Sequence, residues 1–337
     1  MTDPKEIPVL VTGGAGYIGS HAVLALRDAG RKVAVIDNLT TGFRFAVPED
    51  VPFYQGDIQD AELLANIFAE EKIGAVMHFA GSIVVPDSVE DPLGYYHNNT
   101  VKSRALIEAA VKAGVRHFIF SSTAATYGVP NVSPVTEDTP KQPINPYGWS
   151  KLMTEQMLAD TAFAHAINYC TLRYFNVAGA DPQARTGQST AGATHLIKVA
   201  VEAALGKRDS VAVFGTDYDT PDGTGVRDYI HVSDLAAAHL HALDALIEQP
   251  KRSLTMNCGY GRGFSVLEVL DAVDRVTNKA IERVMSPRRA GDPASLISDP
   301  TRIRATVPWQ PQYDDLDTII DHALQWERKL TDLRTEG

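Results

Sequence analysis

A glycine-rich stretch near the start of the chain is the feature that most constrains its fold. The sequence VTGGAGYIGSH, residues 11–21, follows a β-branched apolar run and opens a segment with helical periodicity. Gly13, Gly16 and Gly19 allow a tight turn, close approach of a diphosphate and close packing of a helix against a strand. The start of the helix then offers N–H groups to phosphate oxygens. Glycines alone also suit a simple turn, but their place between a strand and a helix predicts a phosphate-binding loop.

Two acidic residues at later strand ends extend this interpretation. Asp37 ends the next apolar run, 18 residues after Gly19. A carboxylate at this place accepts hydrogen bonds from the adenosine ribose and repels a 2′-phosphate, which favours NAD over NADP. Asp57, after the third run, is placed to meet the edge of the adenine ring. Together these residues predict that the chain binds NAD.

Short apolar runs alternate with longer amphipathic segments through the first half of the chain. Such alternation predicts a parallel sheet with helices on both faces, an α/β fold of the Rossmann-type, doubly wound kind. We expect strands in residues 7–13, 32–38, 51–57, 74–81 and 116–122. We expect helices in residues 17–29, 60–71 and about 92–113, where apolar residues recur at helical spacing.

The second half of the chain is less regular. Residues 216–228 and 286–295 are polar and rich in turn residues, so we expect loops there. At 337 residues the chain is longer than one ordinary single-core domain. We expect an NAD-binding domain in residues 1–176, with a returning segment near 229–250. A smaller substrate-binding α/β domain is expected mainly in residues 177–337.

Charge and cysteine content narrow the possible partners. The net charge of −11 argues against a surface that binds nucleic acid or an acidic membrane. Cys170 and Cys258 lie far apart, and neither belongs to a CxxC pair, so we expect no disulfide framework and no zinc site. No secretory signal is visible and no apolar run is long enough for a membrane span. We therefore expect a cytoplasmic protein with no metal.

The stretch INPYGWSKLMTEQML, residues 144–158, pairs a phenol with an ammonium group. Tyr147 and Lys151 are four residues apart, so they share one face of a helix that starts at Pro146. A free phenol, with a pKa of about 10, is ionised in about one molecule in a thousand at pH 7. A nearby positive charge lowers such a pKa by about 1 to 3 units. The pair therefore predicts a general base, although this spacing also arises by chance on solvated helices.

The stretch FIFSSTAATYG, residues 118–128, ends a predicted strand with hydroxyl side chains. Parallel α/β sheets bind ligands at the carboxyl ends of their strands. Thr123 is placed to hydrogen-bond the substrate oxygen that Tyr147 deprotonates. Ser121 and Ser122 are interpreted as structural hydroxyls at the strand end.

Ten segments of this chain resemble one protein family. They are TGGAGYIGSH, DNLTTG, GDIQD, HFAG, YYHNNT, FSSTAATYG, YGWSK, LRYFNVAGA, VFGTDYDTPDGTGVRDYIHVSDLA and PRRAGD. The set resembles the extended short-chain dehydrogenase/reductase family, and within it the UDP-sugar 4-epimerases. The resemblance covers nearly the whole chain, and its later segments are far more specific than the glycine motif.

The resemblance implies a role for each matching residue. It makes Tyr147 the base, Lys151 its electrostatic partner and Thr123 the second hydroxyl. The implied NAD contacts are Gly13, Gly16, Tyr17, Ile18, Gly19, Asp37, Asn38, Asp57, Ile58, Phe79, Ala80, Gly81, Asn98, Thr123, Tyr147, Lys151, Tyr174 and Phe175. The implied UDP-sugar contacts are Thr123, Tyr147, Asn176, His195, Leu196, Ala212, Val213, Phe214, Arg227, Arg289, Asp292 and Leu296. For Arg227 and Asp228, a structural ion pair is the alternative interpretation.

The resemblance also implies NAD-dependent interconversion of UDP-glucose and UDP-galactose. In that reaction the base takes the proton of the sugar 4-hydroxyl while C4 passes a hydride to NAD. The 4-keto sugar turns about its diphosphate and takes the hydride back on its other face. The resemblance further implies a homodimer joined through helices at about 92–113 and 147–165.

Three positions depart from the family pattern. Ile83 stands where relatives often have a lysine near the cofactor, so no charged contact is expected there. His195 replaces an asparagine that commonly precedes the leucine of the substrate loop, and histidine keeps one hydrogen-bond donor. Leu296 stands where some members have a tyrosine that bounds the sugar pocket.

The residues around Thr123 also bear on other functions that the same fold supports. A 4,6-dehydratase or a UDP-glucuronate decarboxylase needs acidic residues beside the threonine, but Ala124 and Ala125 follow Thr123. A 4-epimerase of another UDP-sugar, such as a pentose, a uronic acid or an N-acetylhexosamine, remains the alternative. A binding protein without catalysis is disfavoured because Tyr147, Lys151 and Thr123 are all present.

Overall fold

A seven-stranded parallel sheet, built from strands in residues 9–174 and 254–258, organises the larger part of the protein. The computed structural model describes residues 4–289 and 291–335. The sheet has the order β10-β6-β5-β4-β1-β2-β3, and every neighbouring pair in it is parallel. This confirms the predicted fold class. The strand order reverses between β1 and β4, which is where open α/β sheets bind ligands. The strands are β1 (Val9–Thr12), β2 (Val33–Asp37), β3 (Phe53–Gln55), β4 (Ala75–His78), β5 (His117–Thr123), β6 (Asn168–Tyr174) and β10 (Leu254–Cys258).

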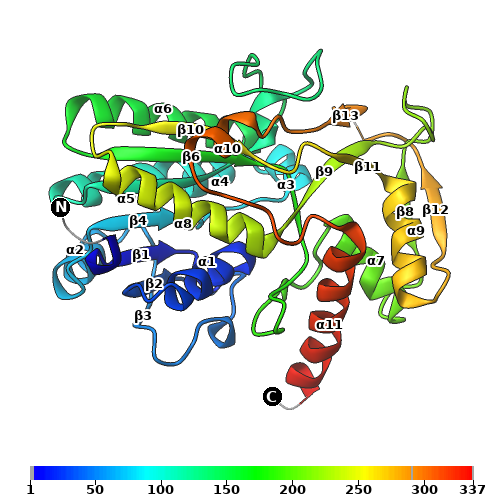
Figure 1. Ribbon diagram of the computed structural model, residues 1–337, viewed down its shortest axis with the longest axis horizontal. Helices are drawn as coiled ribbons and strands as arrows, with labels where there is room; N and C mark the ends of the chain where they lie inside the picture. Colours follow the sequence, from blue (N-terminus) through cyan, green and yellow to red (C-terminus); the bar gives the residue numbers. More distant parts are fainter. Residues whose placement is uncertain (1–3, 290, 336–337) are drawn as a thin grey trace.

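Helices cover both faces of this sheet (Figure 1). On one face α1 (Tyr17–Asp28) packs against α8 (Val232–Glu248), and the other face carries α2 (Ala61–Glu70), α5 (Lys102–Lys112) and α6 (Pro146–Ala164). Side chains alternate between the faces of a strand. Leu10 of β1 therefore joins the apolar core beneath α2 and α5, while its neighbours Val9 and Val11 join the core beneath α8.

The helix expected at about 92–113 contains a change of helix type. Residues Pro92–Tyr96 form α4, residues His97–Val101 form a π-helical turn (η3), and α5 follows directly. A π turn inserts one extra residue and so re-aims the side chains beside it, which is why such turns are frequent at functional sites. The remaining small helices of this half are η1 (Pro4–Glu6), η2 (Arg44–Ala46), α3 (Val85–Glu90) and η4 (Ala124–Tyr127).

The rest of the chain forms a second group of short strands and helices, which lies to one side of the large sheet in Figure 1. Strand β9 (Val226–His231) pairs with β7 (Asn176–Ala178), β11 (Gly263–Ser265) and β13 (Ser295–Leu296), and β8 (Val211–Phe214) pairs with β12 (Arg283–Ser286). The helices are α7 (Leu196–Ala204), α9 (Val266–Thr277), α10 (Thr301–Thr306) and α11 (Leu316–Thr335).

Two features of this half differ from the pattern-based expectation. The loop predicted over residues 216–228 is wrong at its end, because β9 already begins at Val226. Its polar residue Asp228 points into the protein and is fully buried, which disguises the strand in the sequence. Strand β10 also pairs with β6 of the large sheet, although it lies beyond the segment near 229–250 that was expected to return and that contains α8.

Both cysteines are buried in neighbouring strands of the large sheet, and neither forms a disulfide. Within residues 4–289 and 291–335, no helix combines the length and the apolar character that crossing a membrane requires.

Candidate active site

The glycines between β1 and α1 let the loop pack closely against its neighbours and leave the start of α1 without a side-chain cap. Gly13 has a φ of +68°, and a Cβ built on it would lie 2.6 Å from the backbone nitrogen of Ala80. A Cβ on Gly19 would lie 2.1 Å from the carbonyl oxygen of Gly13, so only glycine lets α1 approach the loop this closely. Gly16 is the N-cap of α1 and provides no capping side chain. The first N–H groups of α1 are thus available to phosphate oxygens.

Two carboxylates stand at the ends of the strands beside this loop. Asp37, at the end of β2, accepts hydrogen bonds from the backbone N–H groups of Ala15 (2.9 Å) and Leu39 (2.8 Å). These bonds hold the carboxylate against the glycine loop. Asp57 follows β3 and accepts a hydrogen bond from the N–H of Gln59 at 3.0 Å. The structure therefore brings both predicted adenosine contacts to the same edge of the sheet as the phosphate loop.

Helix α6 presents the phenol and the ammonium group to this edge. Asn145 caps the helix through a 2.8 Å bond from the N–H of Gly148, and Pro146 occupies the first turn, where a missing N–H costs nothing. Tyr147 and Lys151 lie four residues apart on the buried face, with exposed fractions of 8 % and 4 %. Both side chains therefore face the protein interior, which rules out a merely solvated pair.

Burial dominates the acid–base properties of this pair. Burial raises the pKa of the Tyr147 phenol, and a hydrogen bond with Thr123 lowers that pKa by a smaller amount. Burial lowers the pKa of Lys151 to about 8. The Lys151 ammonium donates to the carbonyl oxygen of Ser121 at 3.2 Å and lies 5.2 Å from the centre of the Phe120 ring. The lowered phenol pKa expected from the sequence is therefore not produced by the polypeptide alone, because desolvation of the phenol outweighs the hydrogen bond with Thr123.

The carboxyl end of β5 supplies the hydroxyl groups of the site. Ser121 shares a hydrogen bond with the Tyr174 hydroxyl, and Ser122 donates to Glu155 Oε1 at 2.5 Å. These two serines are thus occupied in structural contacts, as interpreted from the sequence. Thr123 Oγ1 accepts the N–H two residues further along the chain at 3.1 Å. Its hydroxyl hydrogen remains available for a bond toward Tyr147 or a substrate oxygen.

The π turn carries two asparagines to the loop after β4. Asn98 donates to the Ser82 hydroxyl at 2.9 Å. Asn99 accepts the N–H of Ser82 at 2.7 Å and donates to its carbonyl oxygen at 2.9 Å and to the Ser150 hydroxyl at 3.1 Å. Asn98 is among the predicted cofactor contacts, whereas Asn99 is not. Two adjacent asparagines in an otherwise amphipathic helix are the signal for Asn99, because Asn98 is partly exposed and Asn99 is buried.

The glycine loop, the loop after β4 and α6 meet at one place. Gly13 packs against Ala80, as the built Cβ distance shows, and a Cβ on Gly81 would lie 3.5 Å from Lys151 Nζ. The backbone N–H of Phe79 also donates to the Thr12 carbonyl oxygen at 3.0 Å. The predicted cofactor contacts on three separate segments are therefore contiguous with the predicted base.

Arg227 and Asp228 of β9 point in different directions. The Arg227 guanidinium lies 3.6 Å from Asp292 Oδ1 and donates to the carbonyl oxygen of Val226 at 2.8 Å. Asp228 instead accepts four hydrogen bonds from protein donors and is fully buried. The alternative of an Arg227–Asp228 ion pair is therefore wrong. Arg227 and Asp292, both predicted sugar-nucleotide contacts, are brought together.

Leu296 connects the predicted sugar-nucleotide contacts to the carboxyl end of β5. It lies in β13 opposite Arg227 of β9. Its side chain packs on a small buried cluster that includes Ala124, Tyr127 and Phe175. Because Ala124 follows Thr123 directly, Leu296 lies close to the predicted catalytic hydroxyl.

The remaining predicted contacts lie at element ends or in loops. Arg289 places its guanidinium carbon 3.8 Å from the centre of the Phe214 ring in β8, so these two predicted contacts touch. Tyr17 donates its hydroxyl hydrogen to the Gly179 carbonyl oxygen at 2.7 Å, which links α1 to the segment after β7. The others are Ile18 in the first turn of α1, Asn38 after β2, Ile58 after β3, Asn176 at the start of β7, Leu196 at the start of α7, and Ala212 and Val213 in β8.

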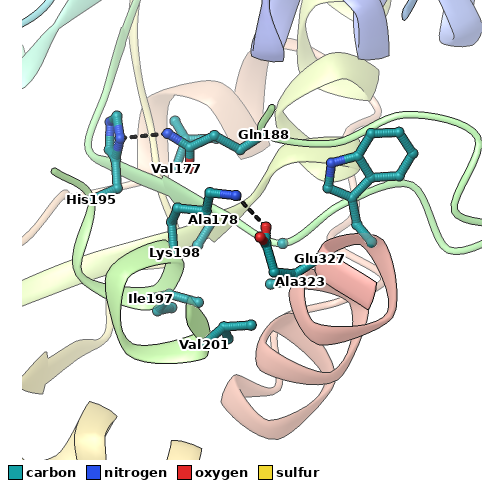
Figure 2. A pocket seen from close by; sticks show the side chains of 11 residues that line it. Val177, Ala178, Gln188, His195, Ile197, Lys198, Val201, Ala323 and Glu327 are labelled. Carbon is teal, nitrogen blue, oxygen red and sulfur yellow. Dashed lines mark hydrogen bonds and ion pairs between the residues drawn. The ribbon is translucent and has the colours of Figure 1, made fainter. Parts of the chain in front are cut away.

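His195 lies beside a small cavity between α7 and α11. Figure 2 shows its ring directed toward Gln188, with Gln188 Nε2 and His195 Nδ1 2.7 Å apart. Burial lowers the pKa of His195, which favours the neutral ring. Lys198 and Glu327 form a buried ion pair across the same cavity (Figure 2). This pair ties α11 to the helix that His195 and Leu196 begin.

No group of three or more His, Cys, Asp or Glu side chains among residues 4–289 and 291–335 is arranged to hold a metal ion.

Comparisons with known proteins agree with this geometry. The model of the NAD dependent epimerase/dehydratase family matches residues 9–259. The UDP-glucose 4-epimerase of Azospirillum brasilense is 56 % identical over 332 residues, which cover 98 % of this chain and 95 % of that relative. The crystal structure of UDP-glucose 4-epimerase from Brucella ovis in complex with NAD is 44 % identical, with a TM-score of 0.91 and 95 % and 98 % of the two chains covered. The UDP-Glc/GlcNAc 4-epimerase of Campylobacter jejuni is 48 % identical, with a TM-score of 0.84 and 96 % and 99 % of the two chains covered.

Proposed function

Because this chain belongs to the NAD dependent epimerase/dehydratase family, we propose that it interconverts UDP-glucose and UDP-galactose with NAD as its cofactor. The observation that carries the proposal is the arrangement of Tyr147, Lys151 and Thr123. They meet at the carboxyl end of β5, beside a glycine loop with an uncapped helix start. The names of relatives that cover nearly the whole chain support the same activity.

The residues at the carboxyl edge of the large sheet fit NAD. In this proposal the uncapped start of α1 binds the diphosphate, Asp37 and Asp57 bind the adenosine, and Lys151, which lies beside Gly81, binds the nicotinamide ribose. When bound, NAD supplies the group that accepts and returns the hydride of sugar C4. Any residue larger than glycine at position 13 would disturb the loop itself, because its Cβ would meet the backbone of Ala80 and the φ of +68° disfavours other residues.

Tyr147 takes the proton of the sugar 4-hydroxyl and returns it at the end of the cycle. Burial raises the pKa of the phenol, so ionisation needs nearby positive charge. The Lys151 ammonium, one helical turn away, provides part of that charge, and the Thr123 hydroxyl donates a hydrogen bond to the phenolate or to the substrate oxygen. The three side chains thus hold and move one proton at the 4-oxygen.

The second group of elements holds the UDP moiety. Arg227 and Arg289 are suited to a diphosphate, since guanidinium groups bind phosphate oxygens in pairs. Leu296 bounds the space next to Thr123 and Phe175. In this proposal residues 1–176, with the segment that returns near 229–250, hold the cofactor, and residues 177–337 hold most of the sugar nucleotide.

We also propose that the protein is a cytoplasmic homodimer joined through α5 and α6. Trp149 and Met153 of α6 leave 41 % and 42 % of their surfaces exposed, and Val101 beside α5 leaves 49 % exposed. Apolar side chains gathered on neighbouring helices favour a protein partner. Light scattering of the purified protein tests this, and a monomer at micromolar concentration would contradict it.

A single incubation tests the activity. The purified protein is mixed with UDP-galactose without added NAD, and UDP-glucose is measured over time. We expect conversion toward an equilibrium mixture, because the cofactor is regenerated in each cycle and stays bound. Denaturing the same preparation should release NAD or NADH rather than NADP, because Asp37 repels a 2′-phosphate. No conversion by a preparation that contains NAD would refute the proposed reaction.

A further inference from the structure

An ion pair joins the first turn of α5 to the loop after β3. Lys102 Nζ lies 2.5 Å from Asp57 Oδ2, and 14 % and 27 % of the two side chains are exposed. The residues are 45 positions apart, so the contact links two separate segments at the edge of the sheet that carries Asp37. A partly buried pair of this kind is screened less by salt than an exposed pair.

Asp57 is held by several other groups as well. Its Oδ1 accepts the N–H of Gln59 at 3.0 Å, and the Asn38 side chain donates to the same carboxylate. Burial raises the pKa of Asp57, but the hydrogen bonds from Lys102 and from the N–H of Gln59 together lower it by more. The net pKa of Asp57 therefore lies below its ordinary value. The group is therefore an ionised acceptor at neutral pH.

The number of free acceptor sites on the Asp57 carboxylate limits which ligand groups it can bind. A carboxylate offers about four lone-pair sites. Lys102, Gln59 and Asn38 occupy three of them. A carboxylate fixed in this way accepts one more hydrogen bond and cannot donate any. It fits the exocyclic amino group of adenine and disfavours a carbonyl oxygen at the same place.

We propose that Lys102 is a positioning residue for the adenine half of NAD, which holds the Asp57 carboxylate in the orientation that accepts the adenine amino group. The proposal rests on the proposed cofactor site, in which Asp57 meets the adenine edge. Lys102 contacts the carboxylate and not the reacting atoms. Its loss therefore weakens adenine recognition and leaves the chemistry at Tyr147 in place.

The test compares two dinucleotides that differ only at the base. The holoprotein is incubated with a large equimolar excess of NAD and nicotinamide hypoxanthine dinucleotide, in which a carbonyl oxygen replaces the adenine amino group, until the bound ratio no longer changes with time. Free nucleotide is removed, the protein is denatured, and both bound dinucleotides are quantified by chromatography. The wild type should retain mainly NAD, because a site built to bind an N–H group rejects an analogue that lacks it.

Lys102→Met should lower the ratio of bound NAD to bound hypoxanthine dinucleotide about tenfold, the effect of weakening one hydrogen bond to a charged group. Lys102→Arg should restore most of the ratio. Lys112→Met is the matched control, because Lys112 pairs with Glu108 on the exposed side of the same helix and is 74 % exposed. That variant should keep the wild-type ratio.

Three results would overturn the proposal. The first is a wild-type ratio in Lys102→Met. The second is loss of both dinucleotides in equal proportion, which indicates a structural role only. The third is a wild type that does not distinguish the two bases. If Lys102→Met does not fold, Asp57→Asn provides an independent test. It should lower the ratio of bound NAD to bound hypoxanthine dinucleotide by weakening the same acceptor. The ratio needs no sugar turnover, so failure here is distinct from failure of UDP-galactose conversion.

Discussion

Asp228→Asn tests how the second group of elements is held together. The Asp228 carboxylate accepts the N–H groups of Tyr260 (3.0 Å), Gly261 (3.0 Å) and Ser298 (3.2 Å), and the Ser298 hydroxyl at 2.6 Å. It thereby joins β9 to the loop after β10 and to the segment after β13. Asparagine has nearly the same shape, but one carboxylate oxygen becomes an NH₂ group that cannot accept.

The expected loss of stability in Asp228→Asn depends on which carboxylate oxygen the amide nitrogen replaces. Asp228 Oδ2 accepts from Gly261 and Ser298, whereas Oδ1 accepts only from Tyr260. The amide therefore places its oxygen at the Oδ2 position and leaves the Tyr260 N–H unpaired, at about 1 to 3 kcal/mol. Burial raises the pKa of Asp228, so removing the charge returns part of the desolvation cost. We expect a net loss of about 1 to 3 kcal/mol in the free energy of unfolding.

Urea unfolding followed by tryptophan fluorescence measures this loss. Asp228→Ala removes both carboxylate oxygens and should cost more than Asp228→Asn, at least about 3 kcal/mol, because the N–H groups of Tyr260 and Ser298 and the Ser298 hydroxyl all lose this acceptor. Asp271→Asn is the control, since Asp271 forms an ion pair with Arg283 but is 64 % exposed. It should change stability by less than about 0.5 kcal/mol. Equal stability of Asp228→Ala and Asp228→Asn, or a wild-type value for Asp228→Asn, would refute the reasoning.

Three further predictions concern the candidate site. Tyr147→Phe should keep NAD bound and lower kcat by about 100- to 10,000-fold, as measured by UDP-galactose turnover, and near-wild-type turnover would remove Tyr147 as the base. Burial lowers the pKa of Lys151 to about 8, so its ammonium group is present below that pH and is lost as the pH rises through it. The amount of NAD that the wild type retains should therefore decline between pH 7 and pH 9.5. It should stay low in Lys151→Met and constant in Lys151→Arg, and a flat wild-type profile would contradict this. Leu296→Ser should raise the ratio of kcat/KM for UDP-N-acetylgalactosamine to kcat/KM for UDP-galactose, and Leu296→Tyr should lower it, by roughly 10- to 200-fold. If neither substitution changes this ratio, Leu296 does not bound the sugar site.

The first half of the fold was predictable because its elements obey local rules. Five strands of the large sheet were predicted from apolar runs, and each has its interior at the expected place. Asn145 and Pro146 likewise mark the start of α6 by their own chemistry, as an N-cap and a first-turn proline. In such segments local preference and tertiary packing agree, so the sequence pattern is sufficient.

Two of the strands that were not predicted, β6 and β9, contain buried charged residues that distant partners stabilise. In β6, Arg173 is buried because its guanidinium pairs with Glu155 of α6 and also donates to the Tyr127 hydroxyl. In β9, Asp228 is buried because donors from residues 32 to 70 positions away surround it. A charged residue breaks the apolar pattern that identifies a strand, and its partners lie outside any local window.

The candidate site shows a similar limit in its chemistry. The spacing of Tyr147 and Lys151 predicted that they share a helix face, and both do lie on the buried face of α6. Spacing does not predict how far each group is desolvated, and desolvation acts on both groups in the direction that opposes their charged forms.

A buried phenol and a buried ammonium group stabilise each other's charge only when both are ionised together. The proton affinity of Tyr147 therefore depends on the protonation state of Lys151. Below a pH of about 8 the ammonium group can support the phenolate, and above it that support is lost. In the proposed mechanism the strength of the base thus depends on the pair and on its burial, which is why the pH profile of Lys151→Arg tests the site more directly than the loss of either side chain alone.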